Sequence, residues 1–340
     1  MNELFLYPLS LVYSILLKAD RYIINRHKKL FKPVISVGNI TLGGTGKTPI
    51  VIELLRLFVK NNLRPVVLTR GYFRCNKHPI LLENGAVNNI DVSDVGDEAL
   101  LISKTVPQST VIVGSNRYSN VLKFKNKIIP DVFILDDGFQ HWHIKRDLDI
   151  VCVNASNPFS NGKLIPAGSL REKPAALKRA SIIIITNSDM ISNTSLENLK
   201  KKLLNFSSTD PIETYYGDFE YKTTDLKTDF DLELLKKSEI YSLSAIGFSE
   251  GFNHSIRKSG IEIKGSISLR DHSYYNNDMI KNIVLNRKNS CFIITSKDAV
   301  KFQNIDIDIL KKIAVLIVKP KFKTGEKNWE QIILKSLQFF

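Results

Sequence analysis

Short runs of apolar, often β-branched residues alternate along the first part of the chain with segments whose apolar residues recur at helical spacing. Each run is mostly apolar, which is typical of a strand buried on both faces of a parallel sheet. The runs predict strands at residues 34–37, 65–69, 111–113, 132–135, 148–153 and 182–186. Segments 47–58 and 94–104 predict helices between them. Strands alternating with helices predict a doubly wound α/β fold with a mostly parallel sheet.

The pattern weakens between residues 210 and 237, where polar and aromatic residues mix without a clear period. This stretch predicts a linker or a hairpin. Strand patterns then resume at 240–243, 292–295 and 313–318, and helical patterns at 252–258 and 326–340. The sequence therefore predicts a second, smaller α/β domain. The expected organisation is an N-terminal segment, a larger domain, a linker and a smaller domain, at residues 1–32, 33–215, 216–237 and 238–340.

The first predicted strand leads into a glycine-rich turn, TLGGTGKT, and then into a helix. Strand, glycine loop, Lys-Thr and helix in this order predict a phosphate-binding loop. Glycine accepts the positive φ angles that let backbone N–H groups surround an anion, and the helix start adds a positive dipole end. Thr41 stands where the strict pattern has glycine. The predicted nucleotide-binding residues are Thr41, Leu42, Gly43, Gly44, Thr45, Gly46, Lys47 and Thr48.

Two adjacent carboxylates, Asp136 and Asp137, follow the apolar run 132–135. In phosphate-loop proteins a carboxylate at the end of a buried strand holds Mg²⁺, directly or through water. Acids at such junctions are common, so the pair is informative because it accompanies Lys47 and Thr48. The predicted metal-binding residues are Thr48, Asp136 and Asp137, and the expected cofactors are ATP and Mg²⁺.

The loop and the acid pair narrow the fold class to an α/β, phosphate-loop NTPase-type, doubly wound, mostly parallel sheet with a second, smaller α/β domain. Ligands of such sheets bind beyond the carboxyl ends of the strands. Several further polar residues follow predicted strands or begin nearby helices, namely Arg70, Asp97, Arg117, Asp136 and Asp137. We therefore expect them to share one rim of the sheet with the glycine loop.

The composition is that of a soluble globular protein long enough for two domains, with 340 residues, 43% hydrophobic and 24% charged. A net charge of +14 favours an anionic partner: nucleic acid, an acidic membrane surface or a phosphorylated substrate. A lysine-rich proteome would explain the charge equally well. No zinc finger, aromatic RNA-binding signature or basic helix is present, so nucleic acid is disfavoured. Three cysteines, Cys75, Cys152 and Cys291, are scattered singly and predict reduced thiols.

The N-terminal stretch LFLYPLSLVYSILL (4–17) is apolar except for two serines, and a basic cluster follows it. Fourteen residues are short for a membrane span, and neither a basic n-region nor a cleavage site marks a secretory signal. Apolar residues followed by basic ones suit a segment that lies in an anionic leaflet. A helix packed on the protein's own core is an equal alternative. The basic residues are Lys18, Arg21, Arg26, Lys28, Lys29 and Lys32.

Several polar residues have an ordinary structural explanation on sequence alone. Asp97 and Glu98 open a predicted helix, where acids complement the helix dipole, and this explanation is favoured. His272 lies beside an acid, but a lone histidine is more often structural than catalytic. The histidines of QHWH (140–143) lack a third metal ligand. A GTPase is disfavoured, because TNSD (186–189) lacks the guanine-reading lysine and SKD (296–298) has the wrong spacing.

A series of short motifs keeps its order over nearly the whole chain. The motifs are GNITLGGTGKTP (38–49), LTRGY (68–72), GDE (96–98), NRY (116–118), ILDDGFQH (134–141), RDLDI (146–150), LIPAGSLRE (164–172), DHSYY (271–275) and TSKDAVK (295–301). In them the chain resembles the tetraacyldisaccharide 4'-kinase family, the lipid A 4'-kinases. The glycine loop is generic, whereas ILDDGFQH and LIPAGSLRE together are specific. The family loop also carries Ser or Thr at the position of Thr41.

The resemblance implies transfer of the ATP γ-phosphoryl group to the 4'-hydroxyl of a tetraacylated glucosamine disaccharide 1-phosphate. It implies a membrane-associated N-terminal segment at the cytoplasmic face of the bacterial inner membrane, an anionic acylated disaccharide as partner, and no obligate protein partner. It implies that Asp97 and His272 form a catalytic acid–histidine pair. We expect domain closure to bring the two residues together. Lys47 is expected to be the third catalytic residue. Four residues in matching motifs are expected near the active site: Arg117, Gln140, Arg171 and Glu172.

A phosphate-loop metallochaperone or regulatory NTPase that hydrolyses ATP or GTP is the alternative. The expected marks of that class, a Cys/His metal cluster or a guanine-reading lysine, are missing from the sequence. A nucleotide-binding module without chemistry would leave Asp97 and His272 without a role. The sequence therefore favours an ATP-dependent lipid kinase.

Overall fold

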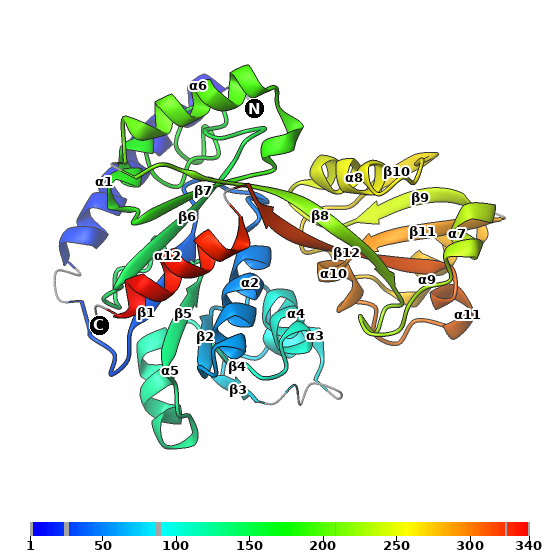
Figure 1. Cartoon of the computed structure of the whole chain (residues 1–340), viewed down its shortest axis with the longest axis horizontal. Helices are drawn as coiled ribbons and strands as arrows, with labels where there is room; N and C mark the ends of the chain where they lie inside the picture. Colours follow the sequence, from blue (N-terminus) through cyan, green and yellow to red (C-terminus); the bar gives the residue numbers. More distant parts are fainter. Residues whose placement is uncertain are drawn as a thin grey trace. The chain divides into compact units, whose positions relative to one another are not determined.

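A computed structural model describes residues 3–23, 27–83, 85, 90–207, 209–287, 289–323 and 325–338 (Figure 1). The chain forms two compact units, each built from separate stretches of sequence. The first unit comprises Met1–Arg70, Gly114–Tyr215 and Lys321–Phe340, and the second comprises Gly71–Val113 and Tyr216–Pro320. The domains expected from the sequence are continuous stretches of chain, whereas each of these units combines separate stretches. The expected domain boundaries stay a prediction.

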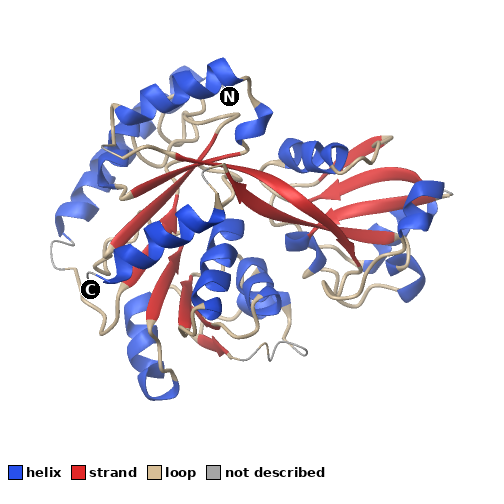
Figure 2. Cartoon of the chain, in the orientation of Figure 1, coloured by secondary structure: helices blue, strands red, loops and turns tan. Residues whose placement is uncertain are grey.

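The first unit is built around a parallel sheet in the order β8-β7-β6-β1-β5-β2. Its strands are β1 (Val34–Gly38), β2 (Pro65–Thr69), β5 (Val132–Asp136), β6 (Leu148–Asn154), β7 (Ile182–Thr186) and the start of β8 (Ile212–Lys222). Every residue of β1, β2, β5, β6 and β7 is buried, as the mostly apolar runs predict. Helices lie on both faces of this sheet (Figure 2). The predicted doubly wound, mostly parallel α/β fold is confirmed.

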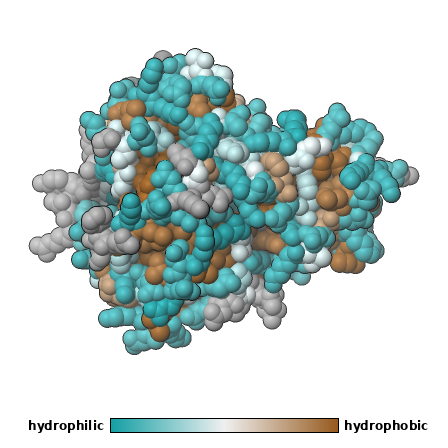
Figure 3. All heavy atoms as spheres, viewed as in Figure 1, coloured by the Kyte–Doolittle hydropathy of each residue, from teal (hydrophilic) through white to brown (hydrophobic). Residues whose placement is uncertain are grey.

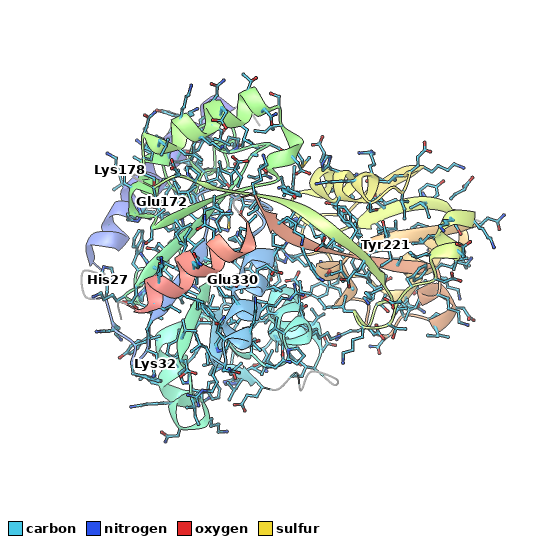
Figure 4. The ribbon with its side chains drawn as sticks, viewed as in Figure 1. His27, Lys32, Glu172, Lys178, Tyr221 and Glu330 are labelled. Carbon is cyan, nitrogen blue, oxygen red and sulfur yellow. The ribbon has the colours of Figure 1, made fainter. Side chains whose placement is uncertain are left out.

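The helices of the first unit are α1 (Glu3–Ile23), α2 (Lys47–Lys60), α5 (Arg117–Phe124), α6 (Asn193–Leu204) and α12 (Glu326–Gln338). Short 3₁₀ turns cover Lys125–Lys127, Pro174–Arg179 and Ser188–Met190. Helix α12 is made from the last residues of the chain, yet it belongs to the first unit. Its Trp329 is buried and stacks on Phe322, and Glu330 pairs with Lys60 of α2 at 2.8 Å (Figure 4). The C-terminal helix therefore completes this unit.

Helix α1 is packed on the protein along one side and exposed along another. On one side Ser10 is buried, donates a hydrogen bond to the Leu164 carbonyl at 2.9 Å and accepts one from the Ala167 N–H at 3.1 Å. Six apolar side chains of the helix are more than half exposed, namely Tyr7, Leu9, Leu11, Val12, Ile15 and Leu16. Within the described part of the chain, no helix is long and apolar enough to span a membrane.

The basic cluster behind the apolar run is described only in part. Arg26 lies outside the described residues, and so do the side chains of Lys18 and Arg21. Lys28 and Lys29 are exposed, and the Lys28 ammonium lies 4.7 Å from the centroid of the Tyr118 ring. On the face drawn in Figure 3, hydrophilic residues cover most of the surface and hydrophobic residues appear at several places.

The second unit contains its own parallel sheet in the order β10-β9-β11-β12. Its strands are β9 (Glu239–Ser244), β10 (Gly265–Ser268), β11 (Ser290–Thr295) and β12 (Ile313–Phe322), the last of which ends in the first unit. The helices in this part of the unit are α7 (Leu232–Lys237), α8 (Ser249–Lys258), α9 (Asn277–Leu285), α10 (Ser296–Ala299) and α11 (Ile307–Leu310). Successive residues of β11, Phe292 and Ile293, belong to different core clusters, so both faces are covered.

The stretch Gly71–Val113 also belongs to the second unit. It contains β3 (Ile80–Leu82) and β4 (Thr110–Val113), which pair antiparallel, and the helices α3 (Val92–Val95) and α4 (Asp97–Thr105). Helix α4 packs against α10. Residues distant in sequence therefore meet inside this unit.

The predicted linker or hairpin at 210–237 is a long strand, a tight turn and a helix. Strand β8 forms because its aromatic residues favour extended backbone, and it passes from the first unit into the second. The turn closes with a hydrogen bond from Thr223 N–H to the Thr228 carbonyl at 2.8 Å and one from Phe230 N–H to the Tyr221 carbonyl at 2.9 Å. The Tyr221 hydroxyl bonds that of Ser259 (Figure 4). This stretch is therefore regular structure with a tight turn, closed by one antiparallel bridge between Lys222 and Asp229. The linker expected at 216–237 stays a prediction.

Candidate active site

The glycine loop connects β1 to α2 in the first unit and has the backbone that its sequence predicts. Gly43 and Gly46 have φ angles of 97° and 74°, in the left-handed region that favours glycine. Gly46 is the N-cap of α2 and has no side chain to cap the first turn. The N–H groups at the start of α2 are therefore left for an anionic ligand.

Polar residues from neighbouring strands hold the carbonyl groups of this loop. Thr186 at the end of β7 donates to the Thr45 carbonyl at 3.1 Å, and Asn154 at the end of β6 donates to the Gly44 carbonyl at 3.4 Å. The Leu42 N–H donates to the Ser169 carbonyl at 2.7 Å. Sequence analysis missed Thr186 and Asn154, although polar residues that end apolar strands were the signal used for Asp136.

The acid pair follows β5 as predicted, and its two members have different surroundings. Asp136 is buried and accepts a hydrogen bond from the Thr69 hydroxyl at 3.1 Å. Asp137 accepts two hydrogen bonds from the Arg171 guanidinium, each 2.8 Å long, and its Oδ1 lies 3.5 Å from Lys47 Nζ. The loop lysine, the second acid and the arginine of LIPAGSLRE therefore form one ionic cluster.

The pKa values of the two acids move in opposite directions. Burial raises the pKa of Asp136, and the charge of Asp137 beside it adds to the rise. Burial would also raise the pKa of Asp137, but Lys47 and Arg171 outweigh it and hold that pKa well below its usual range. Asp137 is thus a carboxylate at all ordinary pH values. Two carboxylates and a hydroxyl are oxygen donors of the kind that Mg²⁺ prefers, so the set Thr48, Asp136 and Asp137 fits that ion.

The other residues expected near the site surround this cluster. Arg117 is buried and donates to the Asp136 carbonyl at 2.8 Å. Gln140 donates to the Asn39 carbonyl at 2.9 Å and to Glu172 at 3.0 Å, and Arg179 donates to the same Glu172 oxygen at 2.9 Å (Figure 4). Arg179 lies 4.3 Å from the ring centroid of Phe139, and sequence analysis did not single it out.

In the second unit, Asp97 and His272 are in direct contact. His272 Nδ1 lies 2.9 Å from Asp97 Oδ2, and the Glu98 N–H donates to Asp97 Oδ1 at 3.0 Å. Asp97 begins α4 after Gly96, whose φ of 86° and close approach to Gly71 disfavour a side chain. The pair forms within one compact unit and is complete in the structure. The expectation that domain closure is needed to bring Asp97 and His272 together is therefore wrong.

Two lysines that sequence analysis left out accompany the pair. Lys297 Nζ lies 2.7 Å from Glu98 Oε1 and 3.7 Å from Asp97 Oδ2, and Lys301 Nζ lies 3.6 Å from the same Asp97 oxygen. The two lysines are four residues apart, at the start of α10 and just after it, a spacing that puts side chains on one face of a helix. That spacing within TSKDAVK was the available signal.

Burial and neighbouring charges set the ionisation of this group. Burial by itself would raise the pKa of Asp97, but its contacts with Glu98, His272 and Lys297 lower it below the usual range. Burial raises the pKa of Glu98 to about 7. Burial would lower the pKa of His272, yet the hydrogen bond to Asp97 raises it. Asp97 is therefore an aspartate whose partner imidazole holds a proton more firmly than a free histidine.

Aromatic side chains cover the exposed side of the pair. A small, partly open pocket is lined by Tyr72, Phe73, Val92, Asp97, His272, Tyr274 and Lys301. The ring of Phe73 lies 5.3 Å from that of His272, and the ring of Tyr72 lies 6.0 Å from it, centroid to centroid. Phe73 and His272 both have positive φ angles, 56° and 62°, which are uncommon outside glycine.

The structure thus gathers the predicted residues into two groups, one in each unit. The first contains the glycine loop, Asp136, Asp137, Arg117, Gln140, Arg171 and Glu172, and the second contains Asp97 and His272. The expectation that Asp97 shares a rim with the loop stays a prediction.

Comparison with known proteins gives one consistent result. Residues 2–338 match the family model described as tetraacyldisaccharide-1-P 4'-kinase. Tetraacyldisaccharide 4'-kinase of Halothermothrix orenii is 34% identical over 330 residues, which cover 90% of this chain and 85% of that protein. The enzyme of the same name from Pelobacter propionicus is 32% identical over 318 residues, which cover 91% of this chain and 85% of that protein. The crystal structure of LpxK from Aquifex aeolicus in complex with ATP superposes with a TM-score of 0.73 at 27% identity, over 97% of this chain and 98% of that one.

Proposed function

This chain belongs to the tetraacyldisaccharide-1-P 4'-kinase family, and on that premise we propose that it transfers the γ-phosphoryl group of ATP to the 4'-hydroxyl of a tetraacylated glucosamine disaccharide 1-phosphate, a step of lipid A biosynthesis. The observation that carries the proposal is the ionic cluster of Lys47, Asp137 and Arg171, in which Lys47 directly follows the glycine loop. The solved LpxK structure, which contains ATP, supports ATP as the phosphoryl donor here.

Phosphoryl transfer depends mainly on positioning and on neutralising charge. The N–H groups at the start of α2 and the Lys47 ammonium are suited to the phosphates, since α2 begins at Lys47 without a side-chain cap. Arg171 keeps Asp137 ionised and in place when Lys47 turns to a phosphate, because it holds both carboxylate oxygens. We propose that Thr48, Asp136 and Asp137 hold Mg²⁺. The bound ion would neutralise charge on the phosphates.

A sugar hydroxyl is a poor nucleophile, so a positioned base that accepts its proton would speed its attack on phosphorus. Asp136 and Asp137 are poorly suited to this task, because a carboxylate that holds a metal ion is a weak base. We propose Asp97 as the base and His272 as the residue that orients it and shares the proton. The contact of 2.9 Å between them, inside a partly covered pocket, supports this assignment.

The acceptor is a lipid, and helix α1 offers a surface for the membrane that contains it. We propose that the exposed side chains of Leu11, Val12 and Ile15 lie in the anionic cytoplasmic leaflet of the bacterial inner membrane. The exposed Lys28 and Lys29 would lie near the headgroups. Tyr13 of the same helix donates to the Arg171 carbonyl at 3.1 Å, so the proposed membrane helix touches the residue that holds Asp137.

The test is direct. The protein is incubated with γ-labelled ATP and the acylated disaccharide 1-phosphate in detergent micelles, and the lipid and inorganic phosphate are separated. We expect label in the lipid. Label in free phosphate alone, with or without the lipid, would reject the kinase assignment and favour the alternative of a regulatory NTPase.

A further inference from the structure

Asp97, Glu98 and His272 offer ligand atoms that all lie within 4.8 Å of one another. Two carboxylates and an imidazole at this spacing would suit a divalent cation. However, a lysine ammonium already lies among them. Lys297 Nζ is 2.7 Å from Glu98 Oε1 and 3.4 Å from His272 Nε2, and it approaches Asp97 Oδ2 to 3.7 Å. The ammonium occupies the place that a metal ion would take. Asp97 and Glu98 therefore have a cation that belongs to the chain itself.

The backbone around Lys297 is held firmly. Thr295 caps α10 by accepting from the Asp298 N–H at 3.0 Å, and its hydroxyl donates to Asp298 Oδ2 at 2.7 Å. The fully buried Asp298 also accepts from the Ala245 N–H at 3.2 Å and pairs with Lys301 at 3.1 Å. The His272 N–H donates to the Ala245 carbonyl at 3.2 Å. The segments that carry the ammonium and the imidazole therefore share one anchor, the backbone of Ala245.

The direction of these contacts fixes the histidine tautomer. An ammonium has three donors and no acceptor, so His272 Nε2 can accept a hydrogen bond from Lys297 only if it carries a lone pair. The ring proton of a neutral His272 then lies on Nδ1, where Asp97 Oδ2 accepts it at 2.9 Å. With Lys297 in place, the imidazole presents its N–H to the carboxylate.

We propose that Lys297 is a positioning residue for the Asp97–His272 pair, a built-in cation that fixes the imidazole tautomer and keeps Asp97 ionised. The inference rests on the proposed function in so far as that pair is the base for the sugar hydroxyl. Lys297 itself is 19% exposed in its side chain and acts through Asp97 and His272.

The charges around Asp97 and His272 determine whether a substitution makes proton binding by these two residues easier or harder. Glu98 on α4, with a pKa of about 7, is negative for part of the molecules at neutral pH. Asp271 beside His272 is negative, Lys297 and Lys301 are positive, and Asp298 is paired with Lys301. The side chains of Tyr72 and Tyr274 also line the pocket. Removing the positive charge of Lys297 makes proton binding by Asp97 and His272 easier. Removing the negative charge of Glu98 makes proton binding by His272 harder.

The experiment compares Lys297→Met, Lys297→Arg and Glu98→Gln with the wild type in the full-length chain. Lys311→Met is the matched control, since Lys311 carries the same charge in an exposed ion pair with Asp308. Two quantities are measured. One is the pH dependence of kcat/KM with ATP and the lipid acceptor. The other is the titration of the His272 ring nitrogens by nuclear magnetic resonance, assigned with a His272→Gln variant.

We expect Lys297→Met to move the acidic limb of kcat/KM, and the titration of His272, upward by about one pH unit, since a unit charge less than 4 Å away is removed. Glu98 would take up a proton in this variant and limit the shift. Lys297→Arg should stay near wild type, Lys311→Met should not differ, and Glu98→Gln should move the His272 titration downward.

Unchanged His272 titration in a folded Lys297→Met protein would overturn the proposal. If Lys297→Met does not fold, an unchanged or upward titration in Glu98→Gln would overturn it equally. The nuclear magnetic resonance measurement needs no turnover. A wild type without kinase activity but with the expected His272 shifts would therefore reject the proposed function and leave the built-in cation standing.

Discussion

Replacing both Asp97 and His272 should cost little more activity than replacing Asp97 alone. The two side chains meet through one charge-assisted hydrogen bond of 2.9 Å, and Asp97 is 4% exposed. A bond of this kind is worth about 1.5–3 kcal/mol, which corresponds to roughly 10- to 150-fold in rate. Loss of the base itself should cost about 10²- to 10⁴-fold. We therefore expect Asp97→Asn to be the more damaging single change, and the double variant to lie close to it.

The assay measures kcat at saturating ATP and lipid for the wild type, Asp97→Asn, His272→Ala and the double variant. The KM for ATP should change little, because the glycine loop and its anchors are untouched. Melting temperatures provide the control for folding, since Asp97→Asn leaves the ammonium groups of Lys297 and Lys301 short of a negative partner. Activity is compared only among variants that melt within a few degrees of the wild type.

Two results would refute this reasoning. If the two single losses multiply in the double variant, the residues act independently and do not form a catalytic pair. If Asp97→Asn keeps most of its kcat, Asp97 is only an acid that stabilises the start of α4, as the sequence alone first suggested. In either case the proton of the sugar hydroxyl has another acceptor.

Other variants test the remaining assignments. Lys47→Ala should lower transfer by orders of magnitude without unfolding the protein, because Lys47 meets charge that grows in the transition state; near-wild-type turnover would remove the phosphate-loop assignment. Asp136→Ala and Asp137→Ala should each reduce Mg²⁺-dependent activity, measured as rate against Mg²⁺ concentration, and an unchanged requirement in both would make the acid pair structural. The double variant Leu11→Glu/Ile15→Glu should bind anionic vesicles several-fold more weakly in sedimentation, because both side chains are exposed and apolar. Vesicle binding equal to wild type would show that this face of α1 does not meet the membrane.

The strands and the glycine loop could be predicted because their signals are local. Strands β1, β2, β5, β6 and β7 are mostly apolar runs, and the loop needs glycine where φ is positive, as at Gly46. The acid pair could be predicted for the same reason, since residues directly after a buried strand lie at one edge of the sheet. These features depend on a few neighbouring residues.

The surroundings of Asp97 could not be predicted, because they depend on contacts across long stretches of chain. Asp97 and His272 are 175 residues apart, and the strand-and-helix pattern assigned them to different domains. Nothing in the pattern indicates that Gly71–Val113 joins the second unit. Nothing in the local sequence distinguishes Lys297 and Lys301 from solvated lysines, because their contacts depend on the packing of α10 against α4. Helix α1 was ambiguous because its two sides differ: Ser10 is buried while Leu11 is exposed.

The contribution of α12 to the first unit has a consequence for how the protein is made. A ribosome releases the chain from its N-terminus, so the glycine loop and the first sheet emerge long before Lys321–Phe340. Until then the site that Trp329 fills stays open, and the first unit waits while the whole of Tyr216–Pro320 is synthesised. A premature stop near residue 320 would therefore leave the second unit's segments whole and remove from the first unit the helix whose Glu330 pairs with Lys60 of α2.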